Sequence, residues 1–216
     1  MKKSEASSVV IIDSLFIFGV LEYINRQGKF GKVTMNYRTL IRYLLEGQII
    51  GGLPFRKPEK ILIECAISST SEPQRRFTEM LRGCGYLVQE VDYSRTYIFP
   101  APTAHLGREG GNGVASLSPT IAYLLGMISG RKNPQVLVVS GCISLFDPLV
   151  DFVKNRGGKA GIVFFKRFLD PEWMVRGLGN EDFPIKFYDL AILSKDLLGI
   201  DSFTQKDTKQ TGVGIL

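Results

Sequence analysis

The 216-residue sequence has little cysteine and almost no histidine. Its three cysteines, Cys65, Cys84 and Cys142, form no CxxC pair, and His105 is the single histidine. This set is too small for a disulfide framework or a closed zinc site. The cysteine usage is typical of a protein from a reducing compartment.

Long hydrophobic runs are also missing. No stretch reaches the roughly 18 uninterrupted apolar residues that a membrane span needs. The lysines at positions 2 and 3 precede an apolar stretch, as in a secretory signal, but Asp13 interrupts that stretch and no small-residue cleavage pattern follows residues 21–23. We therefore expect a cytoplasmic protein that makes no use of a membrane.

The composition favours a globular domain with a basic surface. The chain is 44% hydrophobic, has a formal net charge of +6 and has a pI near 9.2. A chain of this length and composition can bury one full core, so we predict a single domain over residues 1–202, followed by a loose polar tail over residues 203–216. The excess of positive charge favours an acidic partner such as nucleic acid.

Apolar runs of strand length alternate with segments of helical spacing. Alternation of this kind predicts a three-layer α/β sandwich, in which a mainly parallel sheet is covered by helices on both faces. The predicted strands cover residues 9–13, 60–65, 86–91, 136–140, 161–165 and 185–189.

Start signals locate several helices. Apolar residues recur with helical spacing over residues 37–45. Ser71 precedes Glu72-Pro73-Gln74 as an N-cap with a capping-box partner, Ser118-Pro119 repeats the signal, and Asp147-Pro148 supplies a third start with Asp147 as its N-cap. Residues 99–117 are rich in glycine and are expected to form a long connection close to the binding cleft.

Asp13 occupies the position of greatest functional interest. It ends the strand Val9-Val10-Ile11-Ile12 and directly precedes an apolar helix start. The strand over residues 136–139 likewise ends in a small turn, Ser140-Gly141-Cys142. Ligands of open α/β sheets bind in the crevice at such strand ends, so these two turns are the predicted site.

The chain resembles the NYN domain family of PIN-like nucleases in Asp13, in residues 76–88, in Ser140-Gly141 and in Pro148-Leu149. The resemblance implies a PIN-like, Rossmann-like fold in which acids at strand ends hold divalent metal for RNA cleavage. The chain departs from the family pattern where the family carries an asparagine and acids; the residues at these positions are Phe16, Ala115, Cys142 and Ser144.

These departures leave Asp13 as the one matching acid. A catalytic magnesium ion needs several oxygen ligands, so the resemblance implies a catalytically depleted module. We expect it to bind RNA or a protein partner in nucleic-acid metabolism without a cofactor.

Two other functions remain open. The first is an active ribonuclease that uses Mg²⁺ or Mn²⁺, with Asp13 joined by Asp92 or Asp147. The second is an enzyme that binds a small ligand in the strand-end crevice. Asp13 has the alternative role of accepting backbone hydrogen bonds at the start of the next helix. A role for Cys142 as a nucleophile is disfavoured, because His105 is the single histidine and Pro148 takes the place of the arginine in a phosphatase-like Cys-x5-Arg motif.

Four basic residues are candidate RNA contacts. Arg108 lies in the glycine-rich connection, Lys166 and Arg167 follow a predicted strand at its carboxyl end, and Arg76 lies on a basic helix. For Arg76 the alternative is a solvated helix face without a ligand.

Overall fold

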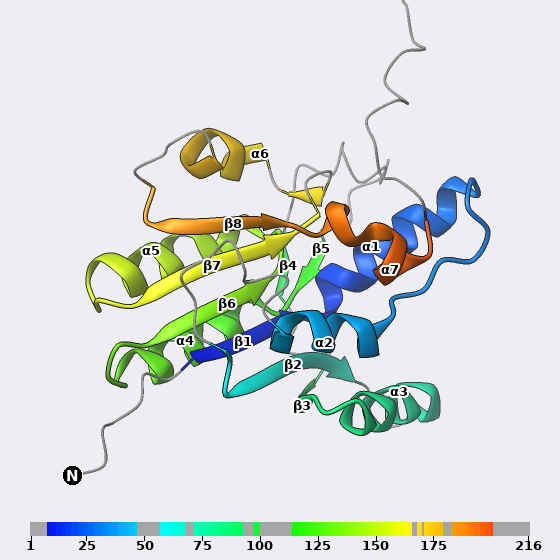
Figure 1. The fold of residues 1–216 in the computed structure, drawn as a ribbon, viewed down its shortest axis with the longest axis horizontal. Helices are drawn as coiled ribbons and strands as arrows, with labels where there is room; N and C mark the ends of the chain where they lie inside the picture. Colours follow the sequence, from blue (N-terminus) through cyan, green and yellow to red (C-terminus); the bar gives the residue numbers. More distant parts are fainter. Residues whose placement is uncertain are drawn as a thin grey trace, which may run out of the picture.

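The fold is built on a six-stranded parallel sheet (Figure 1), with the strands in the order β3-β2-β1-β6-β7-β8. The computed structural model describes residues 8–46, 57–67, 71–92, 97–99, 114–165, 168–169, 171–178 and 183–200. The strands of the sheet are β1 (Ser8–Asp13), β2 (Lys60–Ile67), β3 (Leu87–Asp92), β6 (Gln135–Val139), β7 (Lys159–Phe164) and β8 (Ile185–Asp189).

The central strands are buried along their whole length because both faces of the sheet are covered. Every residue of β1 and β6 is buried. Ile11 in β1 is in register with Leu62 on one side and Val138 on the other. Continuous runs of branched apolar residues are typical of parallel strands between two helical layers.

Helices form a layer on each face of the sheet (Figure 1). One face packs against α1 (Ser14–Gln27), α2 (Tyr37–Glu46), α3 (Glu72–Gly83) and α7 (Ser194–Leu198). The other face packs against α4 (Ser118–Ser129) and α5 (Phe146–Lys154), together with Trp173 at the end of α6 (Pro171–Trp173). A π-helical turn, Met174–Leu178, follows α6, and a 3-10 turn, Leu190–Leu193, precedes α7.

The predicted three-layer α/β sandwich is confirmed, and each predicted strand is present. Counted along the chain, the strands of this sheet have the order 3-2-1-4-5-6, which is the doubly wound, Rossmann-like arrangement. The connections leave β1 and β6 in opposite directions, so the topological switch point lies between these two strands. None of the helices in the parts of the chain that the structure describes is long and apolar enough to cross a membrane.

The structure corrects three details of the prediction. A 3-10 turn (Ile143–Leu145) leads straight into α5, so the N-cap is Leu145 and the predicted cap Asp147 lies inside the first turn. Ser71 is the N-cap of α3 but its side chain makes no capping hydrogen bond. The predicted connection over residues 99–117 includes a strand.

That strand, β5 (Val114–Ser116), pairs antiparallel with β4 (Tyr97–Phe99) in a small separate sheet. Residues 100–113 between them and the predicted tail, residues 203–216, lie outside the described part of the chain.

Candidate functional site

Asp13 ends β1 and caps the helix that follows it. Its Oδ1 accepts hydrogen bonds from the backbone N–H groups of Leu15 at 3.0 Å and Phe16 at 3.2 Å. The residue has the extended backbone of an N-cap and is only 1% exposed. The predicted capping role of Asp13 is therefore confirmed.

A second acid, Glu64, lies beside Asp13 in the sheet. The two residues are register partners in β1 and β2, so their side chains project from the same face. Leu62 and Ala66 flank Glu64 on this face and pack against clusters that contain residues of α4 and Leu117. Glu64 is fully buried, and neither of its carboxyl oxygens has a hydrogen-bond partner among the residues that the structure describes.

Burial raises the pKa of both acids. Desolvation, and to a smaller extent the charge of Asp13, raise the pKa of Glu64 to about 8. Desolvation also raises the pKa of Asp13, but the hydrogen bonds from Phe16, Ser140, Leu15 and Leu117 oppose it, so the value is about 6. Burial therefore favours the protonated form of both acids, and of Glu64 more strongly than of Asp13.

The end of β6 completes this arrangement through Ser140. The Ser140 hydroxyl donates to Asp13 Oδ2 at 3.3 Å and accepts from the backbone N–H of Cys142 at 3.3 Å. Cys142 Sγ in turn lies 3.0 Å from Ser144 Oγ. Cys142 and Ser144 are thus linked to Asp13 through Ser140.

Phe16 fills the space at the switch point. A Cβ atom on Gly141 would lie 2.8 Å from Phe16 Cε2 and 2.8 Å from the Phe168 carbonyl oxygen, so only glycine allows this approach. The Phe16 side chain packs against the clusters on both faces of the sheet. An apolar ring therefore occupies the place where doubly wound folds bind their ligands.

The other candidate acids lie apart from this site. Asp92 ends β3, beyond β2 at the edge of the sheet, and is exposed. The Asp147 side chain is 89% exposed and lies 4.0 Å from Arg176. Among the described residues, no group of three or more His, Cys, Asp or Glu side chains could hold a metal ion.

Of the remaining predicted residues, the structure describes Ala115 and Arg76. Ala115 lies on β5, opposite Ile98, two residues before Leu117, which hydrogen-bonds to Asp13. Arg76 is exposed on α3 and forms an ion pair with Glu72 at 3.0 Å. The structure does not describe three of the basic candidates: Arg108, Lys166 and Arg167.

Sequence reasoning missed Glu64, although the sequence carries a signal for it. The predicted strand over residues 60–65 contains Glu64 as a lone acid between Ile63 and Cys65. A carboxyl inside an apolar strand of a parallel sheet must be buried, which is unusual for glutamate. Such a residue is a candidate for function wherever a second acid lies beside it.

Comparison with known proteins identifies the fold alone. No family model and no curated protein sequence matches the chain. Among solved structures, the chain is similar to the crystal structure of VPA0982, a protein of unknown function from Vibrio parahaemolyticus RIMD 2210633, with a TM-score of 0.55 and 16% sequence identity. The match covers 92% of this chain and 99% of that protein, so the whole Rossmann-like sandwich is shared.

Proposed function

We propose that the chain is a catalytically depleted, NYN-like module that binds RNA. The observation that carries this proposal is the closed end of β1. Asp13 is the acid that the family pattern would use for metal, and here it is buried and bonded to Leu15, Phe16 and Ser140. The scissile phosphate must reach a metal ion that cleaves RNA. Asp13 is buried, and its carboxylate accepts the hydrogen bonds that cap α1.

RNA is the proposed partner because the chain is basic. The net charge of +6 gives favourable long-range attraction to a polyanion. Glu72 forms ion pairs with both Arg75 and Arg76, so this turn of α3 keeps one positive charge in excess. The strand-end candidates Lys166 and Arg167 stay predictions.

Binding and cleavage of labelled single-stranded RNA test the proposal together. We expect salt-dependent binding by the wild-type protein and no cleavage in excess Mn²⁺ above the level of an Asp13→Asn variant. Asparagine retains the side-chain oxygen that caps α1, so this variant removes the charge and keeps the fold. Absence of binding, or cleavage that disappears in D13N, would overturn the proposal.

A second candidate function is the metal-dependent ribonuclease, which the unpartnered Glu64 favours. Carboxylate and hydroxyl oxygens are suitable ligands for Mg²⁺ or Mn²⁺, and Asp13, Glu64 and Ser140 supply them. Both oxygens of Asp13 already accept hydrogen bonds, however. The set therefore falls short of the several available carboxylates that metal-dependent cleavage uses.

Thermal unfolding with and without Mn²⁺ distinguishes the two functions. An ion held by the acid pair would raise the melting temperature of the wild-type protein and leave a Glu64→Gln variant unchanged. We expect the wild-type protein to show no such rise. A rise that E64Q abolishes would favour the nuclease.

A further inference from the structure

The end of α1, the connection that follows it and the first part of α2 are together rich in positive charge. Between Glu22 and Glu46 the sequence contains no acid and five basic residues, which are Arg26, Lys29, Lys32, Arg38 and Arg42. All five are exposed in the structure, and Arg26 forms an ion pair with Glu22. The segment presents a net positive charge to any approaching polyanion.

The loop at the end of α1 is held in one shape. The Asn25 side chain donates to the Val33 carbonyl at 2.9 Å and accepts from the Val33 N–H at 2.6 Å, so it closes residues 26–32 into a loop. Gly28 and Gly31 have φ angles of +65° and +69°. Residues with a side chain rarely adopt this backbone conformation, so glycine is favoured at both positions. The buried Val33 anchors the base of the loop in the core.

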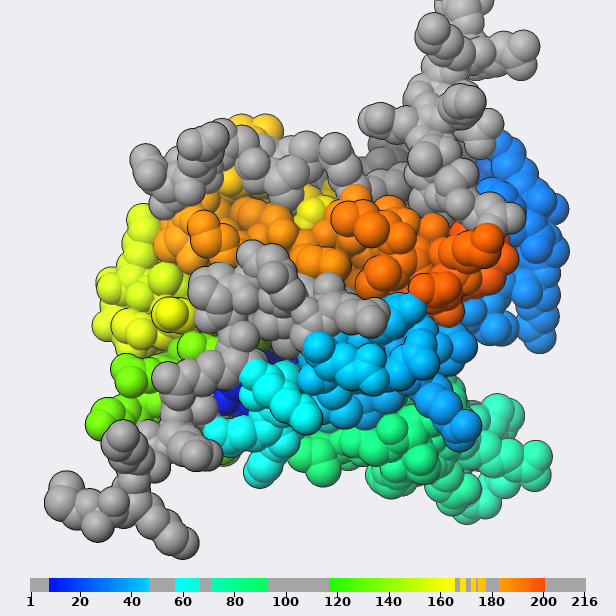
Figure 2. Space-filling view, in the orientation of Figure 1, coloured from blue at the N-terminus to red at the C-terminus, as the bar shows by residue number. Residues whose placement is uncertain are grey.

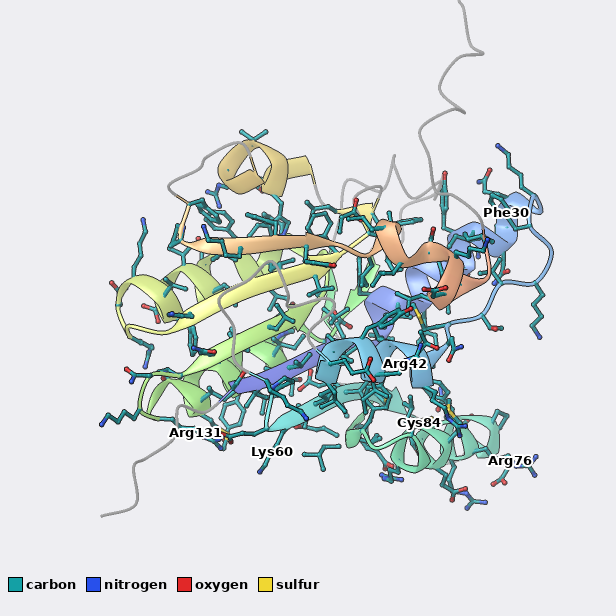
Figure 3. All side chains as sticks on the ribbon, viewed as in Figure 1. Phe30, Arg42, Lys60, Arg76, Cys84 and Arg131 are labelled. Atoms are coloured by element: carbon teal, nitrogen blue, oxygen red, sulfur yellow. The ribbon has the colours of Figure 1, made fainter. Side chains whose placement is uncertain are left out.

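Phe30 stands at the tip of this loop between two lysines. Its side chain is 47% exposed, and Lys29 and Lys32 on either side are exposed as well. The loop extends beyond the end of α1, where Phe30 is labelled in Figure 3, and Figure 2 shows the same segment at the outer edge of the molecule. Arg42, also labelled, projects from α2.

We propose that the loop from Arg26 to Lys32 is a contact site for single-stranded RNA, with a base stacked on Phe30 and phosphates beside Lys29 and Lys32. The inference rests on the proposed RNA-binding function and locates it away from the strand-end site. Aromatic rings among basic side chains are the usual means of binding single strands without reading their sequence. A loop fixed before binding loses little conformational entropy when the strand arrives.

A membrane surface is a weaker match to this loop than RNA. Insertion into the headgroup boundary uses an extended apolar face that enters by about 5–10 Å. Phe30 is the one large exposed apolar side chain of the loop, and about half of its surface is already covered. A half-covered ring can still stack on a base, because stacking needs one free face of the ring.

Fluorescence anisotropy with a labelled oligouridylate tests the site in the full-length protein. We expect Phe30→Ala to weaken binding by about 5- to 150-fold with an unchanged salt dependence, because it removes one stacked base. A Lys29→Gln/Lys32→Gln variant should weaken binding and make the slope of log K against log salt shallower by about 1.4. Circular dichroism checks that both variants fold, as substitutions of exposed side chains should allow.

A charge-matched control uses lysines at the other end of the strands. Lys154 at the end of α5 and Lys159 at the start of β7 are exposed, and a Lys154→Gln/Lys159→Gln variant should bind RNA like the wild type. Equal losses in this control and in the loop variant would overturn the site, because binding would then depend only on total charge.

The outcomes separate the two proposals. If the wild-type protein binds no RNA, the proposed function fails. If the wild type binds and F30A binds equally well, the function stands and the loop site alone is overturned. Sedimentation with phosphatidylserine vesicles provides the remaining comparison: binding to vesicles that F30A abolishes, without RNA binding, would assign the loop to a membrane surface.

Discussion

Glu64 is buried and has no hydrogen-bond partner in the described part of the chain, so its protonation should govern how stability varies with pH. Its pKa is about 8 in the folded protein against 4.5 ordinarily, so the folded state holds the proton more tightly. The contribution of Glu64 to the free energy of unfolding is then fully present below about pH 4.5 and is lost as the pH rises through 8. Asp13, with its pKa raised to about 6, contributes in the same direction at lower pH.

A Glu64→Gln variant should remove most of this loss. Glutamine keeps the shape and carries no charge, and one pKa unit corresponds to about 1.4 kcal/mol, so we expect E64Q to gain about 2–4 kcal/mol over the wild type near pH 9. Urea unfolding at acidic, neutral and alkaline pH measures the difference. Parallel pH profiles for the two proteins would show that Glu64 is not the group responsible.

Asp13 should contribute to stability through the cap of α1. Replacement with alanine removes the acceptor for Leu15 and Phe16, and loss of an N-cap costs about 0.5–2 kcal/mol. Asp13→Asn retains an oxygen at the same position and should lose much less. Chemical unfolding at pH 7 compares the variants, and equal losses would mean that the charge of Asp13, rather than its capping, is what matters.

At the scale of single elements, the α1–α2 loop depends on Asn25. An Asn25→Ala variant loses both hydrogen bonds to the backbone of Val33, at about 0.5–1.5 kcal/mol each. We expect a lower free energy of unfolding and faster amide exchange over residues 26–33, while α4 and α5 stay unchanged. Hydrogen exchange followed by mass spectrometry makes this comparison, and an unchanged loop would show that Asn25 does not hold it.

The regular elements could be predicted because each has a strong local pattern. The strands β1 and β6 contain the apolar runs Val9–Ile12 and Val136–Val139, which in a parallel sheet reflect cover on both faces. The pair β4 and β5 was missed because each strand has three residues and no period can be detected over that length. The predicted role of Asp147 as an N-cap is wrong because a 3-10 turn begins four residues before it and leads directly into α5. The dipeptide Asp147-Pro148 carries no information about that turn.

The candidate site was predictable only in part. Asp13 and the turn at Ser140 are strand ends, and strand ends of a parallel sheet meet at one edge. The pairing of Asp13 with Glu64 depends on the register between β1 and β2, which local sequence does not specify. The contact of Phe16 with Gly141 depends in addition on β6 lying next to β1.

At the scale of the whole molecule, the order of the strands predicts how the fold opens. The strands β1 and β6 lie inside the sheet and are wholly buried, whereas β3 lies at one edge and most of its residues are at least partly exposed. Amides of the inner strands should exchange only through global unfolding, and those of β3 through local opening. Hydrogen exchange at low denaturant tests this, and equal protection of β3 and β1 would contradict it.

Helix α1 has the buried Asp13 at its first turn and the loop from Arg26 to Lys32 at its end. Its 14 residues form a rod about 21 Å long, and a rod fixed at its first turn determines where its last turn points. Asp13 fixes that first turn to the sheet through its bonds to Leu15, Phe16 and Ser140. Asp13 therefore helps to set the direction in which α1 carries the loop with Phe30 away from the sheet.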